Sequence, residues 1–451
     1  MIRAALLLLC LGACAMAPSG EAPTRAVIAD STLPPMKTFS RPQPRAPRIS
    51  NANLATDFQA LHFQLESGRT LPTFTRFETP ITVAVTGNPP PSLGPDLRRL
   101  LARLRNEAGI DISSTASPDA NIIIEAVSRD DIRRALPQAA CFVIPNVSSL
   151  AEFRRMRRNP RTNWANLTQR TRMAIFLPYD ASPQEVRDCL HEELAQSLGP
   201  LNDLYRLTDS VFNDDNVHTV LTGYDMLILR MTYAPELQSG MTQQEIAAQL
   251  PSILARLNPG GVGLARQPSA PTPRSWVSAV QTALGPGASA PARRSAVNAA
   301  LRIARTEGWT DHRRAFSHYI AGRMIQIHDP AAAQSHYALA MAFYEQTPRT
   351  ELHRAYLATQ IAAFAITQGD GAAALRAINP ALPVARQAEN AALLATLQML
   401  KAEALGLTGR PDQARAVRLD SLGWARYGFG SDWAVRGKLR EIAALNPLRQ
   451  G

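Results

Sequence analysis

The chain has 451 residues, of which 45% are hydrophobic, and it carries 48 Lys and Arg against 37 Asp and Glu. The net charge of +11 would suit a nucleic-acid partner, but the chain opens with a secretion signal, and a secreted chain rarely meets nucleic acid. Only three Lys are present, and no glycine-rich loop ends in Lys-Ser or Lys-Thr, which excludes a nucleotide site of that kind.

The first 14 residues have the pattern of a bacterial lipoprotein signal. Arg3 supplies the charged end, and residues 4–11 form an apolar core that is too short to span a bilayer. Leu-Gly-Ala precedes Cys14 as in a lipobox, whose Cys becomes the lipidated N-terminus. We therefore predict membrane anchoring through Cys14, on the periplasmic face of the outer membrane, because Ala15 stands where an inner-membrane signal would place Asp. An ordinary signal peptide cleaved nearby is the alternative.

The chain has four Cys, and two of them are left after export. Cys10 would be lost with the signal and Cys14 would be lipidated. In the oxidising periplasm, Cys141 and Cys189 are then expected to form a disulfide. It would link a strand at 141–144 to the helix that contains Cys189.

Three further regions follow the signal before the helical end of the chain. Residues 15–53 are rich in Pro and lack apolar periodicity, which predicts a flexible tether. Residues 54–257 alternate strand and helix patterns, as expected of a compact α+β domain. The patterns predict strands at 81–85, 121–127, 141–144 and 173–177, and helices at 94–108 and 131–136.

A helix is expected directly after the last of these strands. Ser182 is its predicted N-cap, Pro183 its first residue, Glu185 the partner in a capping box, and Gly199 its end. At about 100° per residue, positions 192 and 196 share one face, and position 193 lies at the edge of the apolar stripe. A half-buried carboxylate at that edge needs a partner, a metal ion or a shifted pKa.

This helix resembles the metal-binding helix of zincin peptidases. The pattern H-E-x-x-H fails in its obvious register, because position 195 is Ala. Anchored on Gly199, the residues Glu192, Glu193, Gln196 and Asp203 fit the extended motif H-E-x-x-H-x-x-G-x-x-H/D with its first two His replaced. The resemblance implies that Glu192, Gln196 and Asp203 would be metal ligands and Glu193 the general base.

Because the first two His of the motif are replaced, the sequence does not establish whether a metal is bound or which metal it would be. Zn²⁺ favours nitrogen and sulfur ligands, so carboxylate and amide oxygens would bind it weakly. A hydrogen-bonded polar network left from a former metal site is the alternative. His218 is a candidate replacement ligand. The loop that contains His218 could also bind Ca²⁺ through oxygen atoms of its side chains. Asn and Asp are, however, common in turns that bind no metal. The oxygen-bearing side chains of this loop are Asp209, Asn213, Asp214, Asp215 and Asn216.

A second stretch strengthens the resemblance. The sequence LTGYDMLILRMTYAPEL at 221–237 is similar to the helix that follows the Met-turn of metzincins, which begins Thr-x-x-Asp and ends in Tyr. The matching residues are Thr222, Asp225, Leu227, Leu229 and Tyr233. The order of the predicted strands and helices also agrees with a zincin-like domain.

About half of the chain resembles one bacterial family. The segments DFQALHFQLESGRTLPTFTRFETPITVAVTG, CLHEELAQSLGPLNDLYRLTDSVFNDDN and LTGYDMLILRMTYAPELQSGMT are similar to the family of domain of unknown function 2927. The resemblance implies a lipoprotein without an established activity, and it supplies no substrate.

The rest of the chain is expected to be helical. Residues 258–294 are rich in Pro, Gly, Ala and Ser and are predicted to be a linker, interrupted by a short helix around 276–284. Residues 295–449 have helical periodicity, and turns recur about every forty residues, at Asp329, Gly369 and Gly409, as in tetratricopeptide-like helix pairs. Small residues are expected where paired helices meet: Ala338, Ala342, Ala363, Ala374, Ala402 and Ala414. Such solenoids bind partner proteins or peptides on a concave surface.

Three functions are compatible with this organisation, and two of them are favoured together. In the first, the zincin-like domain is inactive and binds a peptide or cell-wall fragment in its former cleft. In the second, the lipid anchor and the helical repeats recruit an envelope protein or peptide, so that the chain is a binding and assembly factor of the cell envelope. The alternative is a metal-dependent peptidase that uses Glu193 as general base. The sequence leaves enzymatic activity open.

Overall fold

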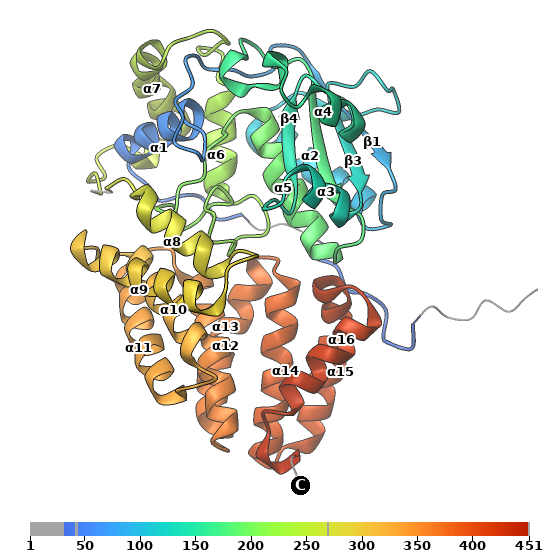
Figure 1. Ribbon diagram of the computed structural model, residues 1–451, viewed down its shortest axis with the longest axis vertical. Coiled ribbons are helices and arrows are strands. Elements are labelled where there is room, and N and C mark those ends of the chain that lie inside the picture. The colour runs from blue at the N-terminus through green and yellow to red at the C-terminus, as the bar shows by residue number, and fades with distance from the viewer. Residues whose placement is uncertain (1–30, 41–43, 268–269, 450–451) are drawn as a thin grey trace, which may run out of the picture.

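The computed structural model describes residues 31–40, 44–267 and 270–449. The predicted signal and Cys14 lie outside these residues. Figure 1 shows an upper domain built around a β-sheet and a lower domain made of helices. In the described part of the chain, no helix is both long enough and apolar enough to cross a membrane.

The upper domain contains five strands and seven α-helices among the described residues. The strands are β1 Ile81–Gly87, β2 Ile112–Ser114, β3 Ile122–Val127, β4 Phe142–Pro145 and β5 Met173–Pro178. The helices are α1 Asn51–Phe63, α2 Leu93–Ala108, α3 Arg129–Ala135, α4 Leu150–Met156, α5 Pro183–Leu198, α6 Gly223–Thr232 and α7 Gln243–Leu257. The four predicted strands and four of these helices, α2, α3, α5 and α6, were expected; β2, α1, α4 and α7 were not.

The sheet has the strand order β2-β1-β3-β5-β4. Its strands are parallel except for the edge strand β4, which runs antiparallel to β5. Parallel neighbours need a crossover between them, and the intervening helices supply it. The domain is therefore α/β, where the sequence predicted the α+β type.

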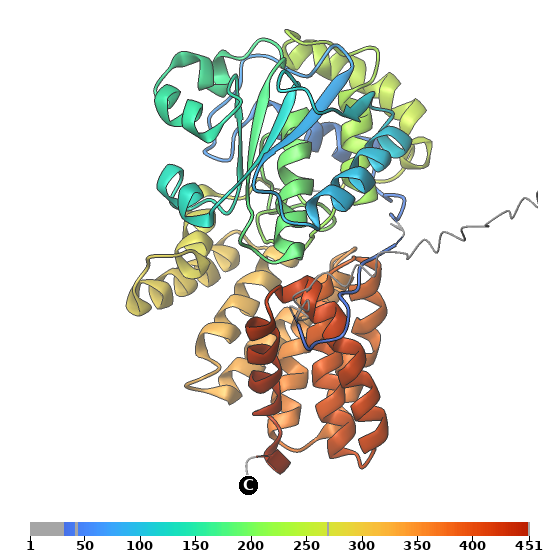
Figure 2. The same ribbon diagram turned by 90° about the vertical axis from the view of Figure 1, so that its right-hand side faces the viewer.

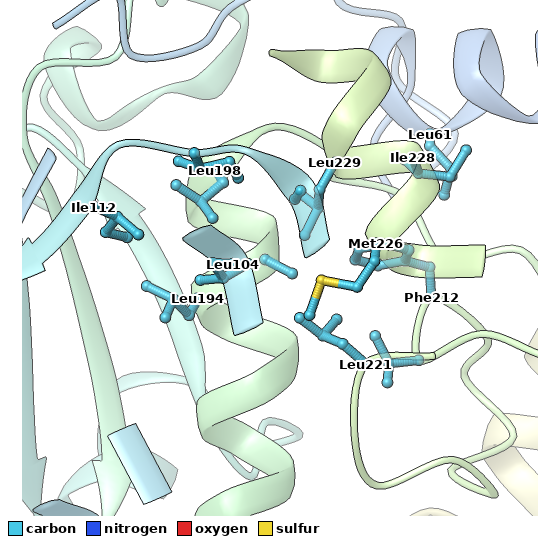
Figure 3. Close-up of a cluster of buried hydrophobic side chains, with 14 of the residues drawn as sticks. Leu61, Leu104, Ile112, Leu194, Leu198, Phe212, Leu221, Met226, Ile228 and Leu229 are labelled. Carbon is cyan, nitrogen blue, oxygen red and sulfur yellow. The ribbon is translucent and has the colours of Figure 1, made fainter. Parts of the chain in front are cut away.

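Both faces of the sheet are covered by helices. Along β5, Met173 and Ile175 point into the core beneath α2 and α5, whereas Ala174 and Phe176 point towards α3 and α4. Because both faces are buried, β5 is an uninterrupted apolar run, MAIFLP. Figure 3 shows how α2, α5 and α6 contribute Leu104, Leu194 and Leu229 to the larger core.

The lower domain is all-helical. Its helices are α8 Arg274–Leu284, α9 Ala290–Thr306, α10 His312–Ile325, α11 Pro330–Gln346, α12 Glu351–Thr367, α13 Gly371–Gln387, α14 Ala391–Leu407, α15 Pro411–Phe429 and α16 Asp432–Ala443. Asp329 caps α11, and Gly369 and Gly409 lie in left-handed turns before α13 and α15, so the three predicted turns are confirmed. Of the six predicted packing alanines, Ala338 and Ala342 are instead exposed.

The predicted linker at 258–294 contains a helix, α8, where the sequence indicates one, and this helix packs as part of the lower domain. Helix α8 packs against α9, and Trp276 on α8 is fully buried and donates from Nε1 to Ser317 Oγ at 3.0 Å. An apolar face that includes this indole cannot remain in solvent without cost. The helical domain therefore begins at α8.

The described part of the predicted tether is also bound to the protein. Phe39 stacks on Trp424 of α15 with ring centroids 4.6 Å apart, and the Lys37 amide donates to the Gly423 carbonyl at 3.0 Å. Figure 2 shows the segment at 31–40 running along the helical domain. The many Pro residues of this region remove the apolar periodicity that would indicate a helix or strand. An extended segment can still be bound through a single aromatic residue, as Phe39 shows.

Candidate functional site

Helix α5 begins where the sequence predicts. The Ser182 side chain accepts a hydrogen bond from the Glu185 amide at 3.2 Å, and Pro183 occupies the first turn. The capping box is incomplete, however, because the Glu185 carboxylate pairs with Arg129 at 2.8 Å and does not return to the N-cap. The helix start was thus predicted correctly and the role of the Glu185 side chain was not.

A buried arginine closes the other end of α5. Arg170 is fully buried, and its guanidinium donates to the carbonyls of Gln196 and Gly199, both at 2.5 Å. Burial lowers its pKa to about 10, so it is still cationic at neutral pH. A positive charge is favourable at the C-terminus of a helix, where carbonyl groups lack partners. No local sequence pattern identified Arg170.

Gly199 ends the helix because other chain segments pass close by. A Cβ at this position would lie 2.6 Å from Thr232 Cγ2 and 3.0 Å from His62 Nε2. His62 donates or accepts on both ring nitrogens, with Phe58 O at 2.8 Å and Thr232 Oγ1 at 2.9 Å. Glycine is therefore needed here for packing between α5, α1 and α6.

The predicted disulfide between Cys141 and Cys189 is confirmed. The two sulfur atoms are bonded and the Cα atoms are 5.9 Å apart. The bond joins the residue before the edge strand β4 to the middle of α5. It fixes the helix to the sheet directly before the carboxylate residues.

The predicted site residues on α5 and after it form one acidic cluster. Glu193 and Gln196 are buried, with 5% and 7% of their surface exposed, while Glu192 and Asp203 are half-buried. Glu193 Oε2 and Asp203 Oδ1 are buried atoms without a hydrogen-bond partner. The charge of Glu192 contributes to the raised pKa values of both Glu193 and Asp203. Helix α5 and the loop after it therefore bring these side chains close together, as the motif implies.

Burial raises the pKa of every carboxyl group in this cluster. The pKa of Glu192 rises to about 8, because burial and then the charges of Glu66 and Asp214 disfavour its ionised form. Burial likewise holds the pKa values of Glu193 and Asp203 well above their ordinary values. At neutral pH the cluster therefore retains protons.

Two members of the cluster were not identified as site residues beside α5. Glu66 lies after α1 and is within hydrogen-bonding reach of the Asp203 carboxyl. Asp214 comes from the oxygen-rich loop and accepts from the Tyr205 hydroxyl at 2.9 Å. After burial, the contact with Glu66 is a further cause that raises the pKa of Asp203, because two neighbouring carboxylates repel each other.

Histidine side chains lie away from this cluster. His191 Nδ1 accepts from the Leu221 amide at 3.1 Å, on the opposite side of α5. His218 donates from Nε2 to the Thr208 carbonyl at 3.1 Å, and burial lowers its pKa. Neither imidazole is placed to replace the His residues missing from the zinc motif.

The donor set does not fit a zinc ion. Over 31–40, 44–267 and 270–449, no three or more His, Cys, Asp or Glu side chains are arranged to hold a metal. The oxygen atoms that converge near α5 are carboxyl and amide oxygens, which Zn²⁺ binds less readily than imidazole or thiolate.

The oxygen-rich loop makes hydrogen bonds within the protein. Asp215 accepts from the Val217 amide through Oδ1 and from Asn213 through Oδ2, which also lies 2.8 Å from His353 Nε2 of α12. Asn213 donates to the Leu207 carbonyl at 2.5 Å. These oxygens are used to shape the loop and to bind the helical domain.

Helix α6 has the start predicted from the second motif. Thr222 and Asp225 form a reciprocal capping box, and Asp225 also accepts from Ser210 Oγ at 2.5 Å. Leu227 and Leu229 are buried in the core. Tyr233, directly after α6, donates from its hydroxyl to the Leu198 carbonyl at 3.1 Å, so the motif returns to the end of α5.

The helical domain covers the loop between α5 and α6. The His312 ring donates to the Tyr205 carbonyl at 2.5 Å, and Tyr205 packs edge-on against Trp276 at 5.0 Å. Both domains therefore fix the chain that follows the acidic cluster.

Comparisons with known proteins concern mainly the upper domain. No curated protein sequence matches the chain. Residues 51–252, which include the whole sheet together with α5 and α6, match the model of the family described as "Protein of unknown function (DUF2927)", and over this region the chain is similar to that family.

Proposed function

We propose that this chain is a non-catalytic binding and assembly factor of the bacterial cell envelope. Its upper domain would be a zincin-like domain that has lost its metal, and its tetratricopeptide-like helical domain would bind an envelope protein or peptide. Lipidation of Cys14 would hold the protein on the periplasmic face of the outer membrane.

The observation that carries the proposal is the set of donor atoms along α5. Glu192, Gln196 and Asp203 stand at the ligand positions of the zincin motif and offer only carboxyl and amide oxygens, while His191 and His218 make hydrogen bonds elsewhere in the protein. Zn²⁺ favours imidazole and thiolate ligands over such oxygens, so this set opposes tight zinc binding. Glu193 is buried beneath them with 5% exposure, which leaves little access for a substrate.

The zincin-like ancestry has support beyond the motif. The single antiparallel edge strand β4 and the passage from β5 directly into α5 agree with the order expected for such a domain. The contact between Tyr233 and the end of α5 joins the two stretches on which the resemblance rests. Fold resemblance alone does not carry an activity, since function depends on the site.

A second candidate is a metal-dependent peptidase with Glu193 as general base. One observation favours it: Glu193 Oε2 and Asp203 Oδ1 are buried without partners, as expected of atoms that a ligand would satisfy. Burial also raises the pKa of Glu193 above its ordinary value, which is the direction that suits a general base. The absence of imidazole at the site weighs against this candidate.

The test separates the two candidates by their dependence on Glu193. The purified full chain is incubated with Zn²⁺ and a fluorogenic peptide library, next to Glu193→Gln. We expect no cleavage that differs between the two proteins. Cleavage that the wild type performs and Glu193→Gln loses would establish the peptidase.

The proposed localisation at the outer membrane is tested separately. Cys14→Ser should move the protein from the membrane fraction to the soluble periplasmic fraction, because the variant lacks the acylated thiol. An unchanged distribution would remove lipid anchoring from the proposal and leave the binding role to be judged by itself.

A further inference from the structure

One of the five tryptophans of the chain is exposed. Trp433, on α16, has 78% of its surface in solvent. The other four are buried or half-buried: Trp164, Trp276, Trp309 and Trp424. A single apolar side chain on a surface is common, so the residues around this indole decide whether it belongs to a binding surface.

Helix α16 carries Trp433 on the face that points away from the protein. The helix lies at the edge of the helical domain (Figure 1), and Val435 and Ile442 are buried in the core of that domain. At about 100° per residue, positions 433, 436 and 440 lie within about 60° of one another, on the opposite side from 435 and 442. Arg436 and Arg440 are exposed. We call Trp433, Arg436 and Arg440 the outer face of α16.

The positive charge of the outer face is not neutralised by neighbouring side chains. In the described part of the chain, neither Arg436 nor Arg440 forms an ion pair, whereas Lys438 on the flank of the helix pairs with Glu441 at 2.9 Å. Arg436 donates a hydrogen bond to the uncharged Thr32 hydroxyl. An indole beside two unpaired guanidinium groups is complementary to a surface that has anionic groups above an apolar layer.

The segment at 31–40 begins directly beside the outer face. The Ser31 hydroxyl donates to the carboxylate of Asp432, the residue before Trp433, at 2.8 Å. Cys14, where we propose lipidation, lies about 17 residues before Ser31, and a chain of that length spans at most about 60 Å. A lipid on Cys14 would therefore keep the outer face of α16 within reach of the bilayer.

We propose that the outer face of α16 lies against the membrane, with the Trp433 indole among the lipid headgroups and Arg436 and Arg440 on lipid phosphates. Tryptophan suits this depth because its ring is apolar and its N–H can still reach a polar partner. Guanidinium groups bind phosphate through paired hydrogen bonds. The inference rests on the proposed function, since lipidation of Cys14 supplies the anchor, and it adds which side of the molecule faces the bilayer.

The experiment reconstitutes the native protein into vesicles of phosphatidylcholine with a minor fraction of phosphatidylglycerol. One set of vesicles carries bromine on the acyl chains close to the headgroups, where it quenches the fluorescence of a tryptophan that touches it. Flotation of the vesicles reports the lipid anchor, and quenching reports the outer face of α16, so the two proposals can fail separately. We expect the brominated vesicles to quench the wild type and to leave Trp433→Phe almost unquenched.

Charge variants test the two arginines. Arg436→Glu/Arg440→Glu should float as the wild type does but lose at least about half of the quenching, because each cation near an anionic membrane contributes about fivefold to binding. Arg294→Glu/Arg302→Glu on α9 is the matched control, because both of these arginines are exposed.

Four results would overturn the proposal. These are a protein that floats without being quenched, a protein that does not float, quenching that Trp433→Phe retains in full, and quenching that both charge variants retain or lose alike. Only the second of them would also remove the lipid anchor from the proposed function.

Discussion

Carboxyl groups beside α5 have environments that favour their protonated forms. The spacing of Glu192, Glu193 and Gln196 could be predicted, because a helical period fixes which side chains share a face. The presence of Glu66 in the cluster could not be predicted, because Glu66 lies more than one hundred residues before α5 and only the fold brings it close to Asp203. Arg170 escaped prediction for the same reason, since its partners are backbone carbonyls at the far end of another element.

The raised pKa of Glu192 predicts how stability depends on pH. Its pKa rises from an ordinary 4.5 to about 8 on folding, so the folded state binds more protons than the unfolded state between these values. The free energy of unfolding should therefore fall as pH rises from about 4.5 to 8, and be unaffected by this group below that window. Glu192→Gln should raise it by about 1–2 kcal/mol at pH 8, allowing for partial solvent contact, and by much less at pH 5.

Urea denaturation at pH 5 and pH 8 measures this effect. Glu345→Gln is the matched control, because Glu345 is exposed on α11 and its substitution should change stability equally little at both pH values. A Glu192→Gln protein that is less stable than the wild type at pH 8 would show that this carboxylate is ionised and paired.

At the scale of elements, α5 is fixed at its start, middle and end. Ser182, the disulfide and Arg170 supply these three attachments. The cap and the disulfide were predictable because they follow local chemistry and the oxidising compartment. The short helix that contains Trp276 was predictable, but the packing of Trp276 and Phe39 against the helical domain was not, because Pro and Gly content does not indicate which residues an aromatic side chain will contact.

Removing the disulfide should destabilise the upper domain. The double variant Cys141→Ala/Cys189→Ala opens a loop of 48 residues, which gains conformational freedom mainly in the unfolded state. The free energy of unfolding should fall by about 2–4 kcal/mol in denaturant titrations. The reduced wild type should show the same loss, and an oxidised wild type no more stable than the double variant would contradict this account.

Loss of the Phe39 ring should free the segment at 31–40 from the helical domain. Phe39 is 7% exposed and stacks on Trp424, so Phe39→Ala removes the main apolar contact of this segment. Limited proteolysis should then cut within 31–40 at least several-fold faster, while the domains remain resistant. Met36→Ala is the control, since Met36 is 39% exposed; equal protection in both variants would show that backbone contacts hold the segment.

At the scale of the whole molecule, the two domains share a buried and partly charged interface. Arg187 of α5 pairs with Glu389 at 3.2 Å, and His353 of α12 lies 2.8 Å from Asp215. These contacts could not be predicted from the sequence, because no periodic pattern indicates which polar residues of one domain will contact those of the other. The domain order was predictable, and the docking was not.

Breaking the Arg187–Glu389 pair should weaken this interface. The Arg187 side chain is only 2% exposed, so Glu389→Ala leaves a buried cation without its partner. The free energy of unfolding should fall by about 3–5 kcal/mol. Glu441→Ala on α16 is the control, since its carboxylate is 66% exposed; similar stability of the two variants would mean that Arg187 finds another partner.

The proposed loss of metal chemistry in the upper domain is tested most directly by the metal content of the full chain, purified without a histidine tag and measured by mass spectrometry of its elements. We expect far less than one transition-metal ion per chain, before and after incubation with Zn²⁺ and removal of excess. Near-stoichiometric zinc that disappears in Glu192→Ala would contradict this account.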